Sequence, residues 1–291
     1  MPAVGKRACM YGLAALGAAG AAAGAYARWI EPNWLAVNEV DVTVPDLAEA
    51  WQGACIAHLS DFQVGLAGAN LGVVRKAIAR AVEAQPDIIA LTGDFLYNGR
   101  GHAHLPGLFA PLSPSQHVFA VLGNHDYGRK KSPDHDRPAE ELASLLRDLG
   151  IRVLRNEAAP IVRHGDQQWI VGLDDVNRKK VDLQRALAQV PAGRRPLVVL
   201  VHEPDFIERM PANTAALVLS GHTHGGQVGL PGREPFSWLN FVGGELRSDY
   251  VEGLYEVNGI RLYVNHGIGM SKFPVRFGTR PELTLLTLQR G

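Results

Sequence analysis

The sequence has few cysteines and no excess of charge of either sign, and each scarcity excludes a class of protein. Only Cys9 and Cys55 occur among 291 residues, which excludes a disulfide framework. Basic and acidic side chains are equal in number, 29 of each, so no electrostatic footprint for nucleic acid is present and no nucleic-acid partner is expected. The body also has no linker that would divide it, and we therefore expect one folded unit there.

The longest uncharged run lies at the N-terminus, from residue 8 to residue 27, after Lys6 and Arg7. It is long enough to cross a bilayer as a helix, although alanine and glycine make up most of it. Its ending Ala25-Tyr26-Ala27 resembles the small-residue site of a cleaved signal peptide. We expect residues 1–30 to be a signal peptide or membrane anchor, with a flexible alanine-rich helix as the alternative. The protein would then be membrane-associated or exported, and the preceding basic pair favours an extracytoplasmic body.

The remaining chain alternates short apolar runs with helical periodicity, which predicts an α/β fold. Residues 31–50 are expected to form a connector and an edge strand, followed by a catalytic-sized unit over residues 51–291. A Gly/Pro/His-rich loop is expected over 99–115. The predicted strands cover 54–60, 87–93, 117–123, 151–154, 160–163, 168–173, 196–202, 215–221, 250–257, 260–266 and 283–288. The predicted helices cover 71–85, 139–150, and segments near 181–190 and 205–210.

Metal-ligating residue types follow five of these strands, where ligands bind in α/β proteins. The five positions are Asp61-Phe62-Gln63, Asp94, Asn124-His125-Asp126, His202 and His222-Thr223-His224. Such a mixed nitrogen and oxygen set suits Mn, Fe or Zn better than Ca or Mg. Asp94 stands alone and is placed to bridge two cations, and His222 and His224 leave a strand end on the same side. The pattern predicts two divalent metal ions of the kind that clamp a phosphoryl group during displacement.

These motifs, with Gly93, Gly123 and Gly221 beside them, closely resemble the signature of the calcineurin-like metallophosphoesterase family. Similarity extends to GHTHGGQVGLPG, NHGIG, Pro274-Val275-Arg276 and Pro281-Glu282-Leu283, which resemble the branch containing membrane-associated phosphodiesterases and UDP-2,3-diacylglucosamine pyrophosphatase-like enzymes. The resemblance implies a four-layer αββα sandwich behind an N-terminal apolar helix. It also implies a phosphoesterase that cleaves a phosphodiester or pyrophosphate bond with metal-bound hydroxide, on a phosphoester substrate that includes lipid-linked molecules such as UDP-2,3-diacylglucosamine.

The resemblance also assigns roles to individual residues. Asp61, Asp94 and His224 would hold one metal, and Asp94, Asn124, His202 and His222 the other. His125 would face the phosphate as an acid or charge stabiliser, and Asp126 would fix the orientation of its imidazole. Arg276 is a candidate contact for the substrate phosphate, with a surface arginine as the alternative.

Gln63 departs from the family pattern, which has histidine at this position. The glutamine can ligate the first metal directly, hold a metal-bound water, or point away and leave the site one ligand short. The third possibility supports a rival function, a non-catalytic or single-metal binding module.

Two further features remain open. His266 ends an apolar strand and is a candidate for the rim of the site. The segment 234–244 carries Phe236, Trp238, Leu239 and Phe241, which could form a lip that enters lipid or a buried cluster. A lipid-nucleotide pyrophosphatase would need a cytoplasmic site, which conflicts with the orientation that the N-terminal charges favour.

Overall fold

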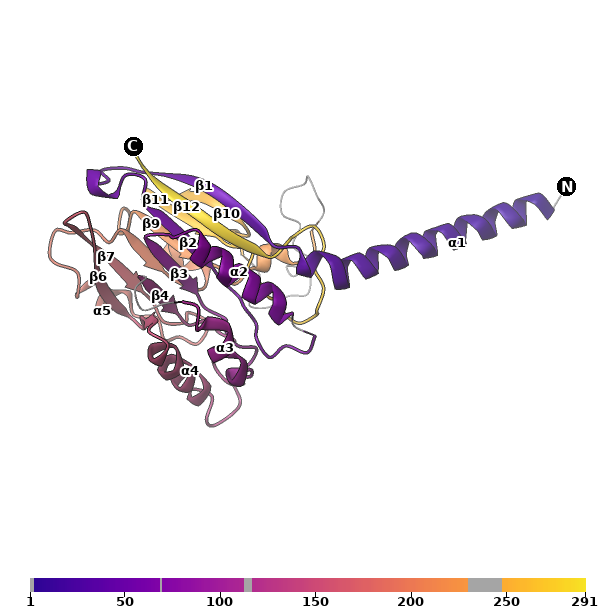
Figure 1. The fold of residues 1–291 in the computed structure, drawn as a ribbon, viewed down its shortest axis with the longest axis horizontal. Coiled ribbons are helices and arrows are strands. Elements are labelled where there is room, and N and C mark those ends of the chain that lie inside the picture. The colour runs from indigo at the N-terminus through magenta and orange to yellow at the C-terminus, as the bar shows by residue number, and fades with distance from the viewer. Residues whose placement is uncertain (1–2, 69, 113–116, 230–247) are drawn as a thin grey trace.

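Two six-stranded sheets stacked face to face form the body of the protein (Figure 1). The computed structural model describes residues 3–68, 70–112, 117–229 and 248–291, and the side chains of the first helix from residue 10 onward. The first sheet has the order β1 (Ala36–Val44), β12 (Glu282–Arg290), β2 (Cys55–Leu59), β3 (Ile88–Thr92), β4 (Val118–Val121) and β5 (Arg152–Val153). The second has the order β10 (Gly253–Val257), β11 (Ile260–Val264), β9 (Leu217–Ser220), β8 (Val198–Leu200), β7 (Asp166–Gly172) and β6 (Glu157–Arg163).

Most of the strand pairs are parallel, and this direction decides where the site forms. Strands β2 to β5 run parallel in the first sheet, and β7, β8, β9 and β11 run parallel in the second. The antiparallel pairs are β12 with β2, β10 with β11 and β6 with β7. The loops that leave the carboxyl ends of the parallel strands therefore gather at one end of each sheet.

Helices cover both outer faces of the sheet pair, which confirms the predicted αββα layering. Between the sheets, apolar side chains from both form one core, including Ile56, Phe119, Leu200 and Leu217. The first sheet is covered by α2 (Leu71–Glu83), α3 (Leu105–Phe109) and α4 (Arg137–Asp148). The second is covered by α5 (Leu183–Leu187) and the 3-10 helix η5 (Pro204–Arg209). Short 3-10 turns lie at η3 (Glu49–Trp51), η4 (His102–His104) and η6 (His224–Gly226).

The expected strands and helices formed, and the described residues add one α-helix and several short turns of helix. Helix α2 lies within the predicted range 71–85 and buries Val74, Ala77, Ile78 and Ala81, and the Asn70 side chain caps it by accepting the Gly72 N–H. The added element is α3, inside the segment predicted as a loop. Pro106 suits the first turn of a helix, and Leu105, Leu108 and Phe109 are buried against the first sheet, so packing outweighs the local loop composition.

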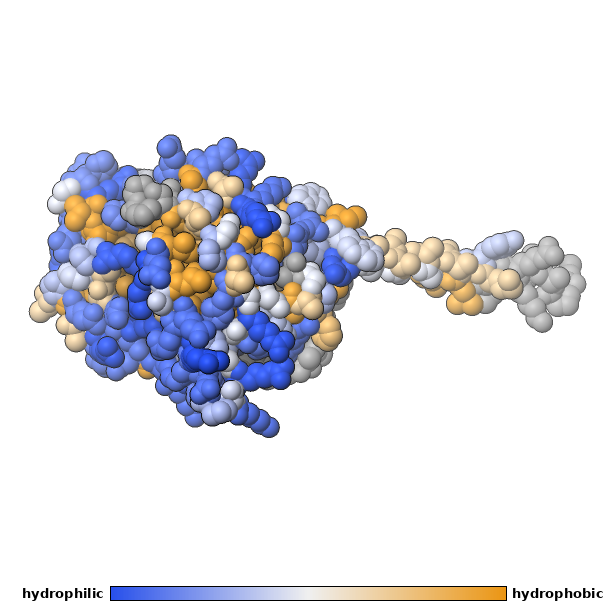
Figure 2. Space-filling view, turned by 60° about the horizontal axis from the view of Figure 1, so that its bottom comes forward, coloured by the Kyte–Doolittle hydropathy of each residue, from blue (hydrophilic) through white to orange (hydrophobic). Residues whose placement is uncertain are grey.

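Helix α1 (Ala3–Ala25) extends away from the body, and its described side chains are exposed (Figures 1 and 2). None of the helices in the described residues is both long and apolar enough to span a membrane. At its base, the π-helix η1 (Tyr26–Ile30) and the 3-10 turn η2 (Glu31–Asn33) contact the loop after β11. The Arg276 N–H donates to the Ala27 carbonyl at 2.9 Å, and the Thr279 N–H donates to Glu31 Oε1 at 2.6 Å. Residues on both sides of the predicted boundary at residue 30 therefore pack on the body.

Candidate metal centre

The predicted ligands follow strands of both sheets, and contacts join six of them in one cluster: Asp61, Gln63, Asp94, His202, His222 and His224. Asp61 and Gln63 follow β2, Asp94 follows β3, and Asn124 follows β4 in the first sheet; His202 follows β8, and His222 and His224 follow β9 in the second. All seven side chains are buried. Ligand atoms of Asp61, Asp94 and His202 lie within 4.8 Å of one another.

Asp94 lies at the centre of the cluster. Its Oδ2 is 3.3 Å from His202 Nε2 and accepts a hydrogen bond from Gln63 Nε2 at 2.6 Å, while its Oδ1 accepts the His125 N–H at 2.8 Å. His202 Nδ1 lies 2.7 Å from the Thr92 carbonyl oxygen and donates to it, which leaves Nε2 turned toward Asp94 and 3.2 Å from His222 Nδ1. Asp94, His202 and His222 thus make up one half of the cluster.

The other half contains Asp61, His224 and Gln63. Asp61 Oδ2 accepts the His222 N–H at 2.9 Å, and its Oδ1 is 3.4 Å from His224 Nε2. Gln63 Nε2 lies 3.5 Å from His224 Nε2 and reaches Asp94 on its other side. Gln63 therefore points toward the cluster, and the part of the third hypothesis that has it pointing away is wrong.

Several polar atoms of the cluster have no hydrogen-bond partner within the described part of the chain. They are Asp61 Oδ1, Gln63 Oε1, Asn124 Oδ1 and His224 Nδ1. Leaving a buried polar atom unsatisfied costs roughly 1–3 kcal/mol, so four such atoms on predicted ligands indicate that something else satisfies them. Carboxylate, amide and imidazole atoms fit a divalent cation of the Mn, Fe or Zn type.

Several ligands of the cluster have a strained backbone conformation. Asp61, Gln63, Asp94, His222 and His224 all have positive φ, between 51° and 72°. Residues with side chains rarely adopt this left-handed conformation, and where they do, the site is often functional.

Gly221 allows the end of β9 to pack closely against the loop after β2. A Cβ on Gly221 would overlap Ser60 Oγ and the Asp61 carboxylate, so only glycine lets β9 end against the loop after β2.

The electrostatics of the two carboxylates differ. Burial raises the pKa of Asp61 above its usual value. Burial also acts to raise the pKa of Asp94, but His202 and His125 outweigh it, and the pKa lies below its usual range. Burial acts to lower the pKa of His202, yet Asp94 and Asp61 hold that pKa well above its usual value. Asp94 is therefore held in its charged form beside His202.

His125 lies beside the cluster with a different partner from the one predicted. Its Nδ1 is 3.1 Å from Asn98 Oδ1, and its ring stacks on Tyr97 with the ring centres 5.0 Å apart. Asp126 instead accepts the Leu96 N–H at 2.8 Å and the Gly123 N–H at 2.9 Å. The prediction that Asp126 orients the imidazole is therefore wrong. Asp126 stabilises the backbone of the loop, and Asn98 contacts the ring; its place four residues after Asp94 was the only signal in the sequence.

Arg276 is not placed to contact a substrate. Its side chain is fully buried, and Nε, Nη1 and Nη2 donate to the carbonyl oxygens of Gly269, Thr279, His266 and Gly267. Neither predicted role, phosphate contact or surface arginine, is correct. Arg276 holds the loop after β11 in shape, and Gly267 of that loop packs against Asp61.

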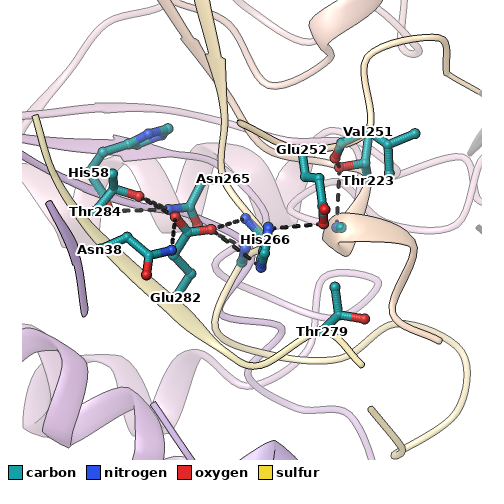
Figure 3. A network of polar contacts seen from close by, with 12 residues as sticks. Asn38, His58, Thr223, Val251, Glu252, Asn265, His266, Thr279, Glu282 and Thr284 are labelled. Carbon is teal, nitrogen blue, oxygen red and sulfur yellow. Dashed lines mark hydrogen bonds and ion pairs between the residues drawn. The ribbon is translucent and has the colours of Figure 1, made fainter. Parts of the chain in front are cut away.

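His266 lies close to Gly225 and between the carboxylates of Glu252 and Glu282 (Figure 3). Its Nε2 is 3.0 Å from Glu252 Oε2, and its Nδ1 is 3.5 Å from Glu282 Oε2. Burial acts to lower the pKa of His266, but Glu282 and Glu252 outweigh it and raise that pKa. His266 is 22% exposed, which is compatible with the expected place at the rim. The predicted aromatic lip, with Phe236, Trp238, Leu239 and Phe241, lies outside the described residues.

Comparison with known protein families shows to which family the chain belongs. The sequence model described as calcineurin-like phosphoesterase matches residues 55–226, the segment that carries all the predicted ligands. The chain belongs to this family of metallophosphoesterases. Family membership makes it a hydrolase of phosphoesters and implies divalent metal ions.

The relatives named here match between three quarters and nearly all of the chain. It is 31% identical over 290 residues to the metallophosphoesterase YkuE of Bacillus subtilis, covering 96% of this chain and 95% of that one. It is 31% identical over 221 residues to the phosphodiesterase YaeI of Escherichia coli, covering 75% and 76% of the two chains. It is 27% identical over 310 residues to the UDP-2,3-diacylglucosamine pyrophosphatase LpxG of Chlamydia trachomatis, covering 90% and 91%. The named relatives agree with the branch that the motifs indicated.

Proposed function

We propose that the chain is a dinuclear metal-dependent phosphoesterase that hydrolyses a phosphodiester or pyrophosphate bond. The observation that carries the proposal is the buried cluster around Asp94, with unsatisfied ligand atoms on Asp61, Gln63, Asn124 and His224. Asp61, Gln63 and His224 would hold one ion, Asn124, His202 and His222 the other, and Asp94 would bridge them. Such ions supply Lewis acidity toward phosphoryl oxygens and an activated water at neutral pH.

Beside the metal ligands, His125 and the two residues that hold its ring have roles in the proposed reaction. Asn98 Oδ1 accepts the Nδ1–H of His125 at 3.1 Å, and Tyr97 stacks against the ring, so the imidazole is held at the edge of the cluster. Burial lowers the pKa of His125, which favours a neutral ring in the resting protein. With its Nδ1–H given to Asn98, the neutral ring can take up a proton at Nε2 and then deliver it to the departing oxygen of the substrate.

The rival function is a binding module that holds one ion, because Gln63 replaces the histidine of the family. Gln63 lies between Asp94 and His224, where an amide oxygen can act as a ligand after rotation of the amide. Metal content separates the two functions. One ion per chain, with activity gained in Gln63→His, would support the rival.

The substrate and the location are further parts of the proposal. The name of LpxG gives that relative a lipid-linked substrate, and this supports a lipid-linked phosphoester for the present chain. Membrane association is supported by the collar around the base of α1, which we define as Trp29, Ile30, Trp34 and Phe273. Each of these side chains is about half exposed or more, and Arg280 lies over the ring of Trp34 at 4.7 Å. Exposed tryptophan beside arginine is typical of a surface at the edge of a bilayer.

Metal titration of the full chain tests the proposed activity. The protein is stripped of metal, and Mn, Fe and Zn are each added back with a chromogenic phosphodiester as substrate. We expect turnover that depends on metal and that is lost in Asp94→Asn. Hydrolysis that stays absent with all three metals would rule the proposed function out.

A further inference from the structure

The loop between β7 and α5 brings an arginine to the metal centre that the sequence did not single out. Arg178 Nη2 and Nε donate to the carbonyl oxygen of Asn124 at 2.7 and 3.3 Å. Its guanidinium also lies over the ring of Tyr127, 5.5 Å from the ring centre. Because Asn124 and His125 are adjacent in the chain, Arg178 lies next to both a proposed ligand and the proposed acid.

Two donors of this loop have no partner. Nη1 of Arg178 and Nδ2 of Asn177 are both buried, and neither has a hydrogen-bond partner among the described residues. Every other polar atom of the Arg178 guanidinium is engaged on Asn124. Buried donors are nearly always satisfied in folded proteins, so two unsatisfied donors on adjacent residues, one of which contacts Asn124, indicate a ligand.

The backbone of the loop is built to hold these donors in place. Glu203, which directly follows His202, accepts the N–H groups of Val176 and Asn177 at 3.2 and 3.1 Å. The Arg178 N–H donates to Asp175 Oδ1 at 2.5 Å. The loop is thereby tied to the same strand end that presents His202, and its position relative to the cluster is set by these bonds.

We propose that Arg178, together with Asn177, forms an anion subsite beside the metal centre that takes a phosphate oxygen of the substrate. The planar guanidinium is suited to phosphate oxygens, and the two open donors are on adjacent residues. The subsite supplies the cationic contact that Arg276 does not. It rests on the proposed function, because the anion it takes belongs to the phosphoester held by the metals.

Arg178 also fixes the Asn124 carbonyl, so a purely positioning role must be separated from anion binding. Arg178→Gln removes the charge at the subsite, and Lys179→Gln removes the same charge one residue away, at an exposed position. Lys179 serves as the matched control for a general loss of positive charge in the loop. Arg178→Lys keeps the charge and loses the planar fork.

The test uses the full chain reconstituted with metal, and inorganic phosphate as the probe, titrated by calorimetry. We expect Arg178→Gln to weaken phosphate binding about tenfold or more, Arg178→Lys to fall between it and the wild type, and Lys179→Gln to bind like the wild type. Metal content should be equal in all four proteins. With a chromogenic phosphodiester, the loss in Arg178→Gln should fall mainly on KM.

Unchanged phosphate affinity in Arg178→Gln, an equal loss in Lys179→Gln, or loss of metal from Arg178→Gln would each overturn the subsite. So would a wild-type protein that does not bind phosphate. Because calorimetry needs no turnover, the outcome is separate from that of the proposed function. A chain that binds phosphate through Arg178 and hydrolyses nothing would contradict the activity and leave the subsite standing.

Discussion

At the scale of single residues, the chemistry of the site follows from side chains that the fold buries without satisfying. Asp61, Gln63, Asn124 and His224 each keep an unsatisfied atom in the cluster, whereas the buried Arg276 donates to four backbone carbonyls. The first group is available to bind, and the second is not.

His125 and its partner Asn98 give the first prediction. His125→Ala should lower kcat about 10²-fold to 10⁴-fold, because the imidazole is the proposed proton donor. Asn98→Gly should cost less, about 10-fold to 100-fold, since the ring stays and loses only its orienting contact. Steady-state kinetics with metal analysis checks both. Metal loss in either variant, or a larger effect of Asn98→Gly than of His125→Ala, would contradict these roles.

Arg276 gives the second prediction, on stability. Arg276→Met leaves several buried carbonyl groups without donors and should lower the free energy of unfolding by about 3 kcal/mol or more. The exposed Arg129→Met should change it by less than about 0.5 kcal/mol. Chemical denaturation measures both. A fully stable Arg276→Met that loses only substrate affinity would restore the role of phosphate contact.

At the scale of elements, the ends of β2, β3, β4, β8 and β9 meet only because small residues let them approach. A methyl group on Gly221 would overlap Ser60 and Asp61. Gly221→Ala should therefore displace Asp61 and reduce metal binding, with loss of activity. Gly107→Ala, in helix α3 where the added methyl meets nothing within 4 Å, should leave metal content unchanged. Elemental analysis of both variants decides, and full metal content in Gly221→Ala would contradict the packing argument.

The arrangement of strands and loops also explains how much of the fold and of the site could be predicted from the sequence. Polar residues directly after apolar strands predicted the ligand cluster, because the carboxyl ends of parallel strands converge. The arrangement of loops was not predictable in this way. Asn98 and Arg178 lie on loops whose course depends on the Gly123–Asp126 turn and on Glu203, and α3 forms because Leu108 and Phe109 find a buried face. Whether an arginine such as Arg276 turns outward or into a ring of carbonyls also depends on tertiary packing.

At the scale of the whole molecule, stability depends on pH in part through His58, a histidine that the fold keeps neutral. His58 is fully buried against Thr92, and burial lowers its pKa to about 3. Its pKa is lower in the folded than in the unfolded protein, so the unfolded state binds the extra proton between about pH 6.5 and pH 3. Stability is therefore lost as the pH falls through this range.

The corresponding prediction concerns how steeply the free energy of unfolding changes with pH. Between pH 6 and pH 4 the wild type should lose up to about 1.4 kcal/mol more per pH unit than His58→Gln, whatever the stability of the variant at pH 7. The exposed His104→Gln should keep the wild-type slope. Denaturant unfolding at several pH values gives the slopes. Equal slopes in the wild type and His58→Gln would refute the assignment.

Counting metal ions tests the central claim most directly, that side chains from two sheets converge to hold a pair of cations bridged by Asp94. The full chain is reconstituted with Mn, Fe or Zn, freed of excess metal and assayed by elemental analysis, beside Asp94→Asn. The account predicts about two ions per chain in the wild type and less than half of that in Asp94→Asn, with phosphodiester hydrolysis lost together with the metal. A wild-type chain that holds one ion or none, or an Asp94→Asn variant that keeps the wild-type complement, would contradict it.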